Sequence, residues 1–191
     1  MKKLLCLLLL CCTACSSTPP ARQDFLLQAS RTGSAQSVRF GALQVQELRA
    51  APPFRDSALV YRETAQRFVA DPYHGFLAPP PVQLSQNLRQ WLRSSGLFAQ
   101  VLPSAGSAAS SWLLEGELLA LYIDVSDPAQ PAAVLELQLQ LHRGTQSFSY
   151  PLAIREALAS AEPEAAAAGL QRALSRALTQ LEQQLTSSKA D

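Results

Sequence analysis

The chain has 191 residues, of which 48% are apolar and 16% are charged. This length and composition suit one domain with a hydrophobic core and exclude an intrinsically disordered chain. The net charge of +1 argues against a nucleic-acid-binding protein, because such domains carry a basic excess that neutralises phosphates. The one long apolar run lies at the N-terminus, which excludes a polytopic membrane protein.

The first fourteen residues have the pattern of an export signal. Lys2 and Lys3 precede the apolar run over residues 4–12, and small residues follow that run. About nine residues at about 1.5 Å each are too few to span a hydrocarbon core of about 30 Å. We therefore predict that residues 1–14 are a signal peptide that is removed on export.

The cysteines indicate how the exported chain is held. All four lie in the first fifteen residues. Residues 12–15 read Cys-Thr-Ala-Cys and resemble a bacterial lipobox, in which small residues precede the cysteine that is acylated after cleavage. We expect Cys15 to carry the acyl chains, since several chains together hold a protein stably on a membrane. The alternative is that Cys15 is one more apolar residue of an ordinary secretory signal.

The residues after Cys15 refine this prediction. Ser16, rather than Asp, follows the cysteine, which by analogy with enteric bacteria favours the periplasmic face of the outer membrane and leaves inner-membrane anchoring open. Loss of Lys2 and Lys3 changes the net charge from +1 to −1, so the acyl chains alone would attach the protein. We predict three regions after the signal peptide: a lipidated cysteine with a flexible tether (15–24), a single domain (25–188) and a tail (189–191).

Short β-type patterns dominate the first half of this domain. Strands are expected at residues 25–27, 38–45, 59–62 and 67–70. The apolar phase changes near Gly41, which predicts a β-bulge there, and residues 71–76 are rich in turn formers. The proline run at 79–81 predicts the start of a helix whose apolar stripe ends at Gly96, a suitable C-terminal cap.

The second half predicts longer elements. Strands are expected at residues 97–102, 112–125, 134–142 and 148–154. A second amphipathic helix is expected over 163–185, with its leucines on one face. The fold predicted from these elements is α+β (mixed α/β), with one mainly antiparallel or mixed sheet and two long amphipathic helices packed on one face.

The residues offer little for catalysis. No cysteine follows Cys15, which excludes thiol chemistry in the domain, and the two histidines are His74 and His142. His74 stands near Asp71, but one histidine and one carboxylate are too few for a zinc site. Asp124 and Asp127 flank Ser126 before a proline, which is typical of a turn. We predict a protein that is not an enzyme and needs no metal or cofactor.

Several short motifs together resemble a known family, the ABC-type transport auxiliary lipoproteins, which include PqiC-like proteins. The resemblance covers nearly the whole mature chain in the order of its elements. It depends on the lipobox and on these segments: Phe25-Leu26-Leu27, Leu59-Val60-Tyr61-Arg62, the aromatic-to-proline step over 73–80, and Leu114-Glu115-Gly116. One departure is Gly75-Phe76, where the family commonly has Arg-Trp.

This resemblance implies a non-catalytic lipoprotein accessory of an intermembrane lipid transport system. Its implied partners are an MCE-domain (mammalian cell entry) protein and the ABC permease and ATPase, with the lipoprotein itself forming a homo-oligomer. Tyr61, Arg62, Tyr73 and Phe76 are the candidate contact residues, since Tyr and Arg favour interfaces. The alternative for these residues is structural: the aromatic side chains pack in the core and Arg62 pairs with a carboxylate.

Two other functions fit the sequence. The protein could be a lipoprotein assembly factor or scaffold for an outer-membrane or cell-envelope complex, which differs from the first function only in its partner. A periplasmic hydrolase that uses His74 is the third hypothesis, although no Gly-x-Ser-x-Gly segment provides a serine nucleophile.

Overall fold

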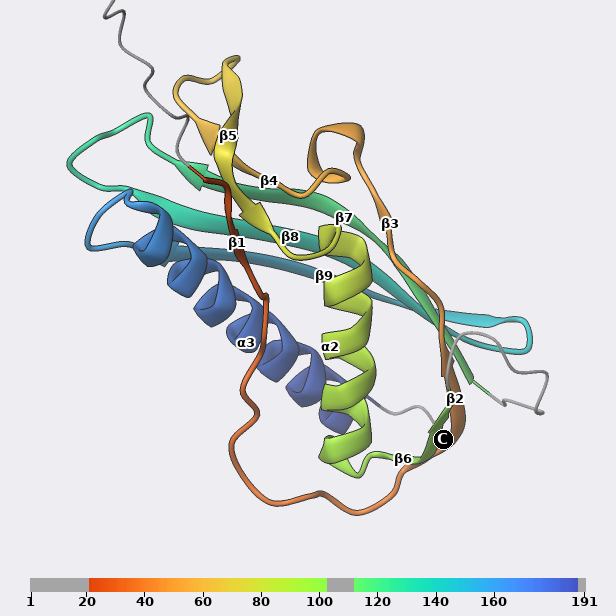
Figure 1. Cartoon of the computed structure of the whole chain (residues 1–191). Coiled ribbons are helices and arrows are strands. Elements are labelled where there is room, and N and C mark those ends of the chain that lie inside the picture. Colours follow the sequence, from red (N-terminus) through yellow and green to blue (C-terminus); the bar gives the residue numbers. More distant parts are fainter. Residues whose placement is uncertain (1–20, 103–111, 189–191) are drawn as a thin grey trace, which may run out of the picture.

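The computed structural model describes residues 21–102 and 112–188, and Figure 1 shows their arrangement. Cys15, the predicted signal peptide 1–14 and the tail 189–191 lie outside the described residues. The strands are β1 (Gln23–Phe25), β2 (Phe40–Val45), β3 (Arg49–Ala50), β4 (Ala58–Arg62), β5 (Phe68–Phe76), β6 (Phe98–Leu102), β7 (Trp112–Asp124), β8 (Ala132–Arg143) and β9 (Gln146–Ala157). The helices are the short 3-10 helix η2 (Pro52–Phe54), α2 (Pro80–Ser95) and α3 (Pro163–Ser187).

Strand β7 organises the nine-stranded mixed sheet. Along one edge it pairs with β8 in antiparallel fashion, and β8 pairs with β9 in the same way. Along its other edge it pairs in parallel with β2, β3 and β4 in turn, so that Leu43 lies opposite Trp112, Ala50 opposite Leu118 and Arg62 opposite Asp124. Three consecutive strands of the first half therefore share one long partner from the second half.

The remaining strands extend the sheet outward. β6 pairs in parallel with β2, β5 pairs antiparallel with β4, and β1 pairs in parallel with β5. β1, β6 and β9 are thus edge strands of the described sheet. The turn between β8 and β9 contains Gly144, which has a φ of 57°, a left-handed conformation that glycine adopts readily.

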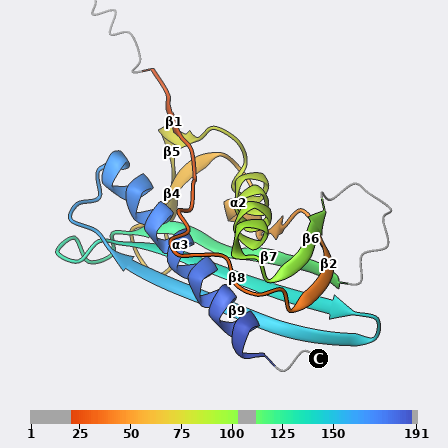
Figure 2. The ribbon, with the colours of Figure 1, turned by 90° about the horizontal axis from the view of Figure 1, so that it is seen from below.

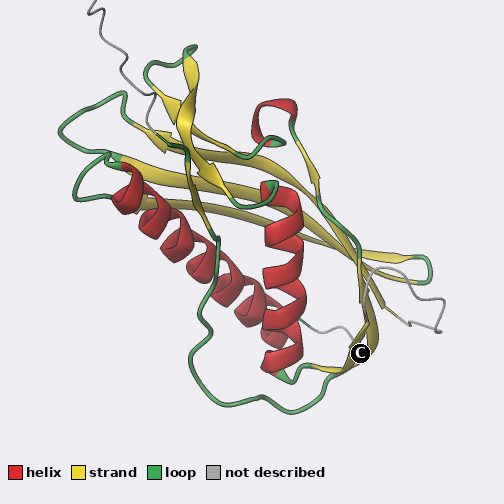
Figure 3. Cartoon of the chain, in the orientation of Figure 1, coloured by secondary structure: helices red, strands yellow, loops and turns green. Residues whose placement is uncertain are grey.

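Both long helices lie on one face of the sheet, as the sequence predicts (Figures 2 and 3). α2 begins with prolines in its first turn, and Gly96 ends it in a left-handed conformation with a φ of 76°. Along β8, buried leucines on the helix side alternate with polar residues that are more exposed. Leu135, Leu139 and Leu141 are all 0% exposed. The hydrophobic core lies between this face and the two helices.

A long segment without regular structure, residues 26–39, passes over α3 and runs beside α2 to its C-terminal end, and we name it the strap (Figure 3). The Leu27 N–H donates to Gln83 Oε1 at 2.7 Å, and the Ala29 N–H donates to Asn87 Oδ1 at 2.7 Å, both on α2. On α3, the Gln171 side chain donates to the Leu26 carbonyl at 2.9 Å. Side chains of the helices therefore replace the backbone partners that a strand would have had.

Local predictions differ from the structure at three places. The strand expected at 25–27 lies at 23–25, so Leu26 and Leu27 belong to the strap. Residues 71–76, which are rich in turn formers, belong to strand β5. Ala70 pairs with Val60 and Gly75 pairs with Ala58, so β5 has extra residues between two neighbouring pairs of the β4–β5 ladder. The turn-forming residues make this bulge in the strand. The bulge expected at Gly41 is absent, because β2 and β6 keep one register there. In the described ranges, neither helix has the length and apolar character that a membrane span requires.

Candidate partner-binding surface

Arg62 and Asp124 meet where the ends of β4 and β7 lie side by side. Arg62 Nη2 is 2.6 Å from Asp124 Oδ2, and Arg155 Nη1 on β9 lies 2.6 Å from the same oxygen. Asp124 is 2% exposed, whereas the side chain of Arg155 is 54% exposed. The register of β4 on β7 places Arg62 here, and two guanidinium groups surround one buried carboxylate.

The electrostatics keep this carboxylate charged. Burial raises the pKa of Asp124, but hydrogen bonds from Ser126, Arg155 and Arg62 bring that pKa well below its ordinary value. The Ser126 backbone N–H and hydroxyl both donate to Oδ1, which is the turn chemistry that the sequence predicts for this segment. Two positive charges and one negative charge leave this group of three side chains with a net positive charge.

Aromatic side chains border the ion pairs. The guanidinium carbon of Arg62 lies 5.3 Å from the centroid of the Tyr122 ring. Phe54 of η2 stacks on Tyr122 with ring centroids 6.2 Å apart, and Phe68 meets Tyr122 edge-on at 5.3 Å. Phe68 is 43% exposed, so this cluster presents apolar area at the surface as well as charge.

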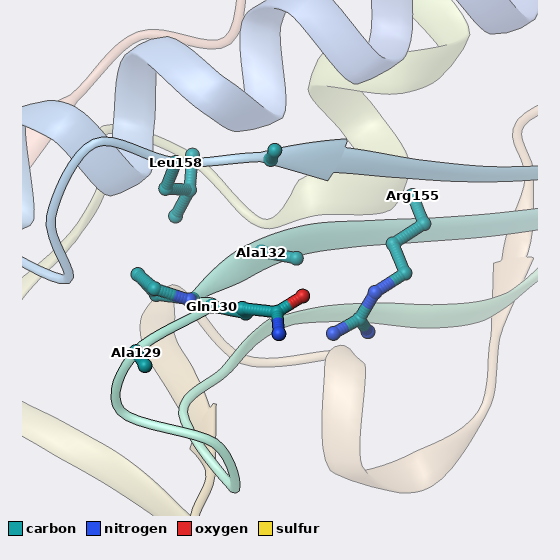
Figure 4. A pocket seen from close by; sticks show the side chains of 7 residues that line it. Ala129, Gln130, Ala132, Arg155 and Leu158 are labelled. Carbon is teal, nitrogen blue, oxygen red and sulfur yellow. The ribbon is translucent and has the colours of Figure 1, made fainter.

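A hollow of about 390 Å³ lies beside Arg155, at the end of the sheet where the β7–β8 loop returns. Figure 4 shows Arg155 and Gln130 on two sides of it, with the Arg155 side chain pointing away from α3. Its lining residues are Ala129, Gln130, Pro131, Ala132, Arg155, Ala157 and Leu158. We name the ion pairs, the aromatic side chains and this hollow together the Arg155 surface. It can accept an acidic or amide side chain from another protein.

Tyr61 does not join this surface. It precedes Arg62 on β4, and successive side chains of a strand point to opposite faces of the sheet. Burial raises the pKa of Tyr61 to about 12, and the charges of Asp71, Glu162 and Glu164 add to that increase. Two of the predicted contact residues therefore face opposite sides of the sheet.

Tyr73 and Phe76 have different surroundings. Tyr73 lies in the β5 bulge and is 42% exposed, and its backbone N–H donates to Asp71 Oδ1 at 2.8 Å. Phe76 is 3% exposed and belongs to the core, so the prediction that it contacts a partner is corrected here. Phe76 is buried because the β1–β5 register places it beside Phe25, with its side chain turned inward.

The histidines form small polar pairs. His74 Nδ1 lies 2.9 Å from Asp71 Oδ2, and His142 Nε2 lies 3.4 Å from Glu115 Oε1. Among residues 21–102 and 112–188, no three histidine or acidic side chains gather closely enough to hold a metal ion. In this geometry His74 and Asp71 hold the β5 bulge in shape, since Asp71 also accepts from two backbone N–H groups.

Arg155 is the residue of this surface that sequence reasoning missed. Alternation along 148–154 assigns one face of β9 to the core, and continuing that alternation would have placed Arg155 on the opposite face. Its ion-pair partner Asp124 is distant in sequence, and no local pattern links the two. Arg62, in contrast, was a candidate from the sequence. The structural alternative considered for it, an ion pair with a carboxylate, is the arrangement found.

Solved structures share this fold. Protein XCC0632 from Xanthomonas campestris matches with a TM-score of 0.68 and 20% identity, over 87% of this chain and 93% of that one. The hypothetical protein CT253 from Chlamydia trachomatis matches with a TM-score of 0.51 and 9% identity, over 78% of this chain and 100% of that one. At these identities the likeness is one of fold. Among curated proteins, no sequence matches the chain.

The mixed sheet and the two helices on one face define an α+β protein with the fold of these solved structures. A family model matches residues 25–182, which include α2, most of α3 and nearly all of the sheet. The chain belongs to the family of ABC-type transport auxiliary lipoprotein components. This confirms the resemblance read from the motifs, and the family is an accessory component of transport rather than a catalytic family.

Proposed function

We propose that the protein is a non-catalytic lipoprotein accessory of an ABC/MCE-type intermembrane (phospho)lipid transport system. It is anchored through an acylated Cys15 and acts by docking to other proteins in the periplasm. The family match over residues 25–182 carries this proposal. The Arg155 surface supports a docking role, because it presents a guanidinium group that is 54% exposed and an aromatic ring, Phe68, that is 43% exposed.

The proposed anchor limits how far the body can move from its membrane. Eight residue steps separate Cys15 from Gln23, where β1 begins. At about 3.5 Å per step they reach at most about 28 Å. The protein therefore works within one protein diameter of the bilayer, at the periplasmic face of the outer membrane, with the inner membrane as the alternative.

The Arg155 surface is the proposed docking site for the MCE-domain protein or the ABC permease. Arginine and aromatic side chains supply much of the binding energy of protein interfaces. Tyr61 and Tyr73 lie outside this surface, so they would serve other contacts, including those between copies of a homo-oligomer.

Capture of partners tests the proposal. The full lipoprotein, cross-linked in cells and purified, should retain an MCE-domain protein, and Arg155→Ala should reduce that capture about tenfold. Arg93→Ala is the matched control, since Arg93 lies exposed in the last turn of α2, away from β9. Capture of a β-barrel or a peptidoglycan synthase without the MCE-domain protein would overturn the proposal in favour of a scaffold.

The anchor is tested separately by the mass of the N-terminal peptide. The proposal predicts that Cys15 is the first residue and carries acyl chains, and that Cys15→Ser releases the protein from the membrane fraction. An unmodified start would remove the lipid anchor while leaving the family assignment intact.

A further inference from the structure

The side of the molecule at which the tether joins the body is fixed by β1. This strand begins at Gln23 and pairs only with β5 in the described sheet. Figure 2 shows β1 and β5 on the far side of the helices from β8 and β9. A chain held at Cys15 therefore approaches its membrane with the β1–β5 side, and the face of the sheet that carries Arg155 points away.

Exposed apolar side chains gather on that same side. Leu26 is 50% exposed and Leu77 is 65% exposed, and each follows directly on the end of its strand. The Leu77 N–H donates to the Phe25 carbonyl at 3.0 Å, which places Leu26 and Leu77 beside each other. Their neighbours Leu27 and Phe76 are each 3% exposed. In each segment, therefore, one side chain points into the core and the adjacent leucine, Leu26 or Leu77, points outward.

Tyr73 extends this apolar area toward the tether. It lies in the β5 bulge, one position before His74, which pairs with Gln23. Tyr73 is 42% exposed, and tyrosine combines an apolar ring with a hydroxyl that stays in water. We name Leu26, Leu77 and Tyr73 the tether-side patch. The other exposed large apolar side chains are dispersed elsewhere in the described chain: Val38, Phe68 and Leu119.

The acidic side chains of β1 and β5 themselves are paired, which limits repulsion between this patch and a phospholipid surface. The two acidic residues of β1 and β5 are Asp24 and Asp71, and each has a cationic or imidazole partner. Arg22 Nε lies 2.8 Å from Asp24 Oδ1, and His74 lies beside Asp71. The face of β7 and β8 away from the helices is more polar. A small hollow there is lined by Glu115, Glu117, Gln138 and Gln140, among others.

We infer that the tether-side patch rests on the surface of the phospholipid bilayer that holds the acyl chains. The inference depends on the proposed acylation of Cys15, because three side chains alone give only weak attachment. The tether keeps the body within reach of the bilayer, so that weak contact suffices to orient it. In this orientation Arg155 and the hollow beside it face the periplasm, where a partner can reach them.

Fluorescence on vesicles tests the orientation. The mature chain has no cysteine beyond Cys15, so single cysteines can be introduced and labelled cleanly. Full lipoprotein carrying Leu77→Cys or Gln140→Cys is labelled with an environment-sensitive dye and reconstituted in vesicles of phosphatidylethanolamine and phosphatidylglycerol. The dye at position 77 should shift to the blue and be quenched by brominated lipid, and the dye at position 140 should do neither.

Further variants test whether the two leucines hold the patch against the bilayer. A label at Tyr73→Cys should lose its quenching when Leu26 and Leu77 are both changed to Ser, while circular dichroism shows an unchanged fold. Equal quenching at positions 77 and 140, or none at 77, overturns the inferred orientation. The mass of the N-terminal peptide separates the two failures: an acylated Cys15 with unquenched labels rejects only the orientation, whereas an unmodified Cys15 rejects both the anchor and the orientation.

Discussion

The indole Nε1 of Trp91 donates to the Glu182 carboxylate at 2.7 Å, which joins α2 to α3 through a buried hydrogen bond. Arg31 of the strap donates to both oxygens of the same carboxylate, at 2.9 and 3.0 Å, and Gln36 donates at 2.8 Å. One acidic side chain that is 8% exposed therefore holds both helices and the strap together.

Glu182→Gln should destabilise the protein by about 2–4 kcal/mol. The amide keeps the shape of the carboxylate but leaves the Arg31 guanidinium, which is 11% exposed, without an anionic partner. Urea unfolding followed by tryptophan fluorescence measures the loss. Glu47→Gln is the control, since Glu47 is exposed between β2 and β3 and should change stability by no more than about 0.5 kcal/mol. Equal effects of the two variants would contradict the role given to Glu182.

The contribution of Asp124 to the stability of the fold should depend on pH. Burial raises its pKa, but the hydrogen bonds from Ser126, Arg155 and Arg62 lower that pKa below 3.8 in the folded protein. A lowered pKa stabilises the fold above pH 3.8, and this contribution is lost as the pH falls below that value. Asp124→Asn should thus be about 2–3 kcal/mol less stable than the unchanged protein at neutral pH, with the difference shrinking in acid. Asp127→Asn, at an exposed turn position, serves as control. A difference that stays constant down to acid pH would rule this out.

Gly116 and Gly169 should respond differently to alanine. A Cβ on Gly116 would lie close to the backbone carbonyl of Gln138, which cannot move without disturbing the β7–β8 pairing. A Cβ on Gly169 would meet the flexible end of the Leu158 side chain, and alanine favours the helix by about 1 kcal/mol. Gly116→Ala should cost about 1–3 kcal/mol and Gly169→Ala less, as thermal unfolding would show. The opposite order would refute this account of the Leu-x-Gly segment.

Tyr61 predicts a loss of stability in alkali. Its pKa rises from 10.0 to about 12 on folding, first because of burial and then because of nearby acidic groups. A raised pKa leaves stability unaffected below pH 10.0 and decreases it as the pH rises toward 12, since the unfolded chain ionises first. Tyr61→Phe should show a smaller decrease, because Tyr122 and Tyr150, whose pKa values burial also raises, remain. Unfolding free energies at about pH 9 and about pH 11 would show the difference. The same slope in both proteins would count against the assigned pKa.

Elements with a local signal were the most predictable from sequence. Proline at the start of α2 and Gly96 at its end define that helix directly, and alternating leucines define β8. The order of the strands was not predictable, because β2, β3 and β4 are short and depend on β7 for their pairing. The path of the strap was not predictable either, because its sequence has no strand or helix periodicity. Its backbone hydrogen bonds with side chains distant in sequence, such as Asn87.

The residues of the candidate surface could be predicted only in part. The Tyr-Arg pair at the end of β4 marks a real ion-pair site at Arg62, but alternation sends Tyr61 to the other face. For Phe76 the structural alternative, packing in the core, is the arrangement found, and its burial depends on pairing with β1, a strand of three residues. Arg155 and Asp124 lie on β9 and β7, and only the sheet brings them together.

The placement of β7 has a consequence for folding during synthesis. β2, β3 and β4 all end before residue 63, whereas their shared partner begins at Trp112. As the chain emerges N-terminus first, β4 can pair early with β5 and β2 with β6. The edge of each that β7 covers, and the whole of β3, must wait for β7. Such distant contacts slow the search for the native state and leave apolar strands open to aggregation. A chaperone that shields the early segments would therefore raise the yield of native protein.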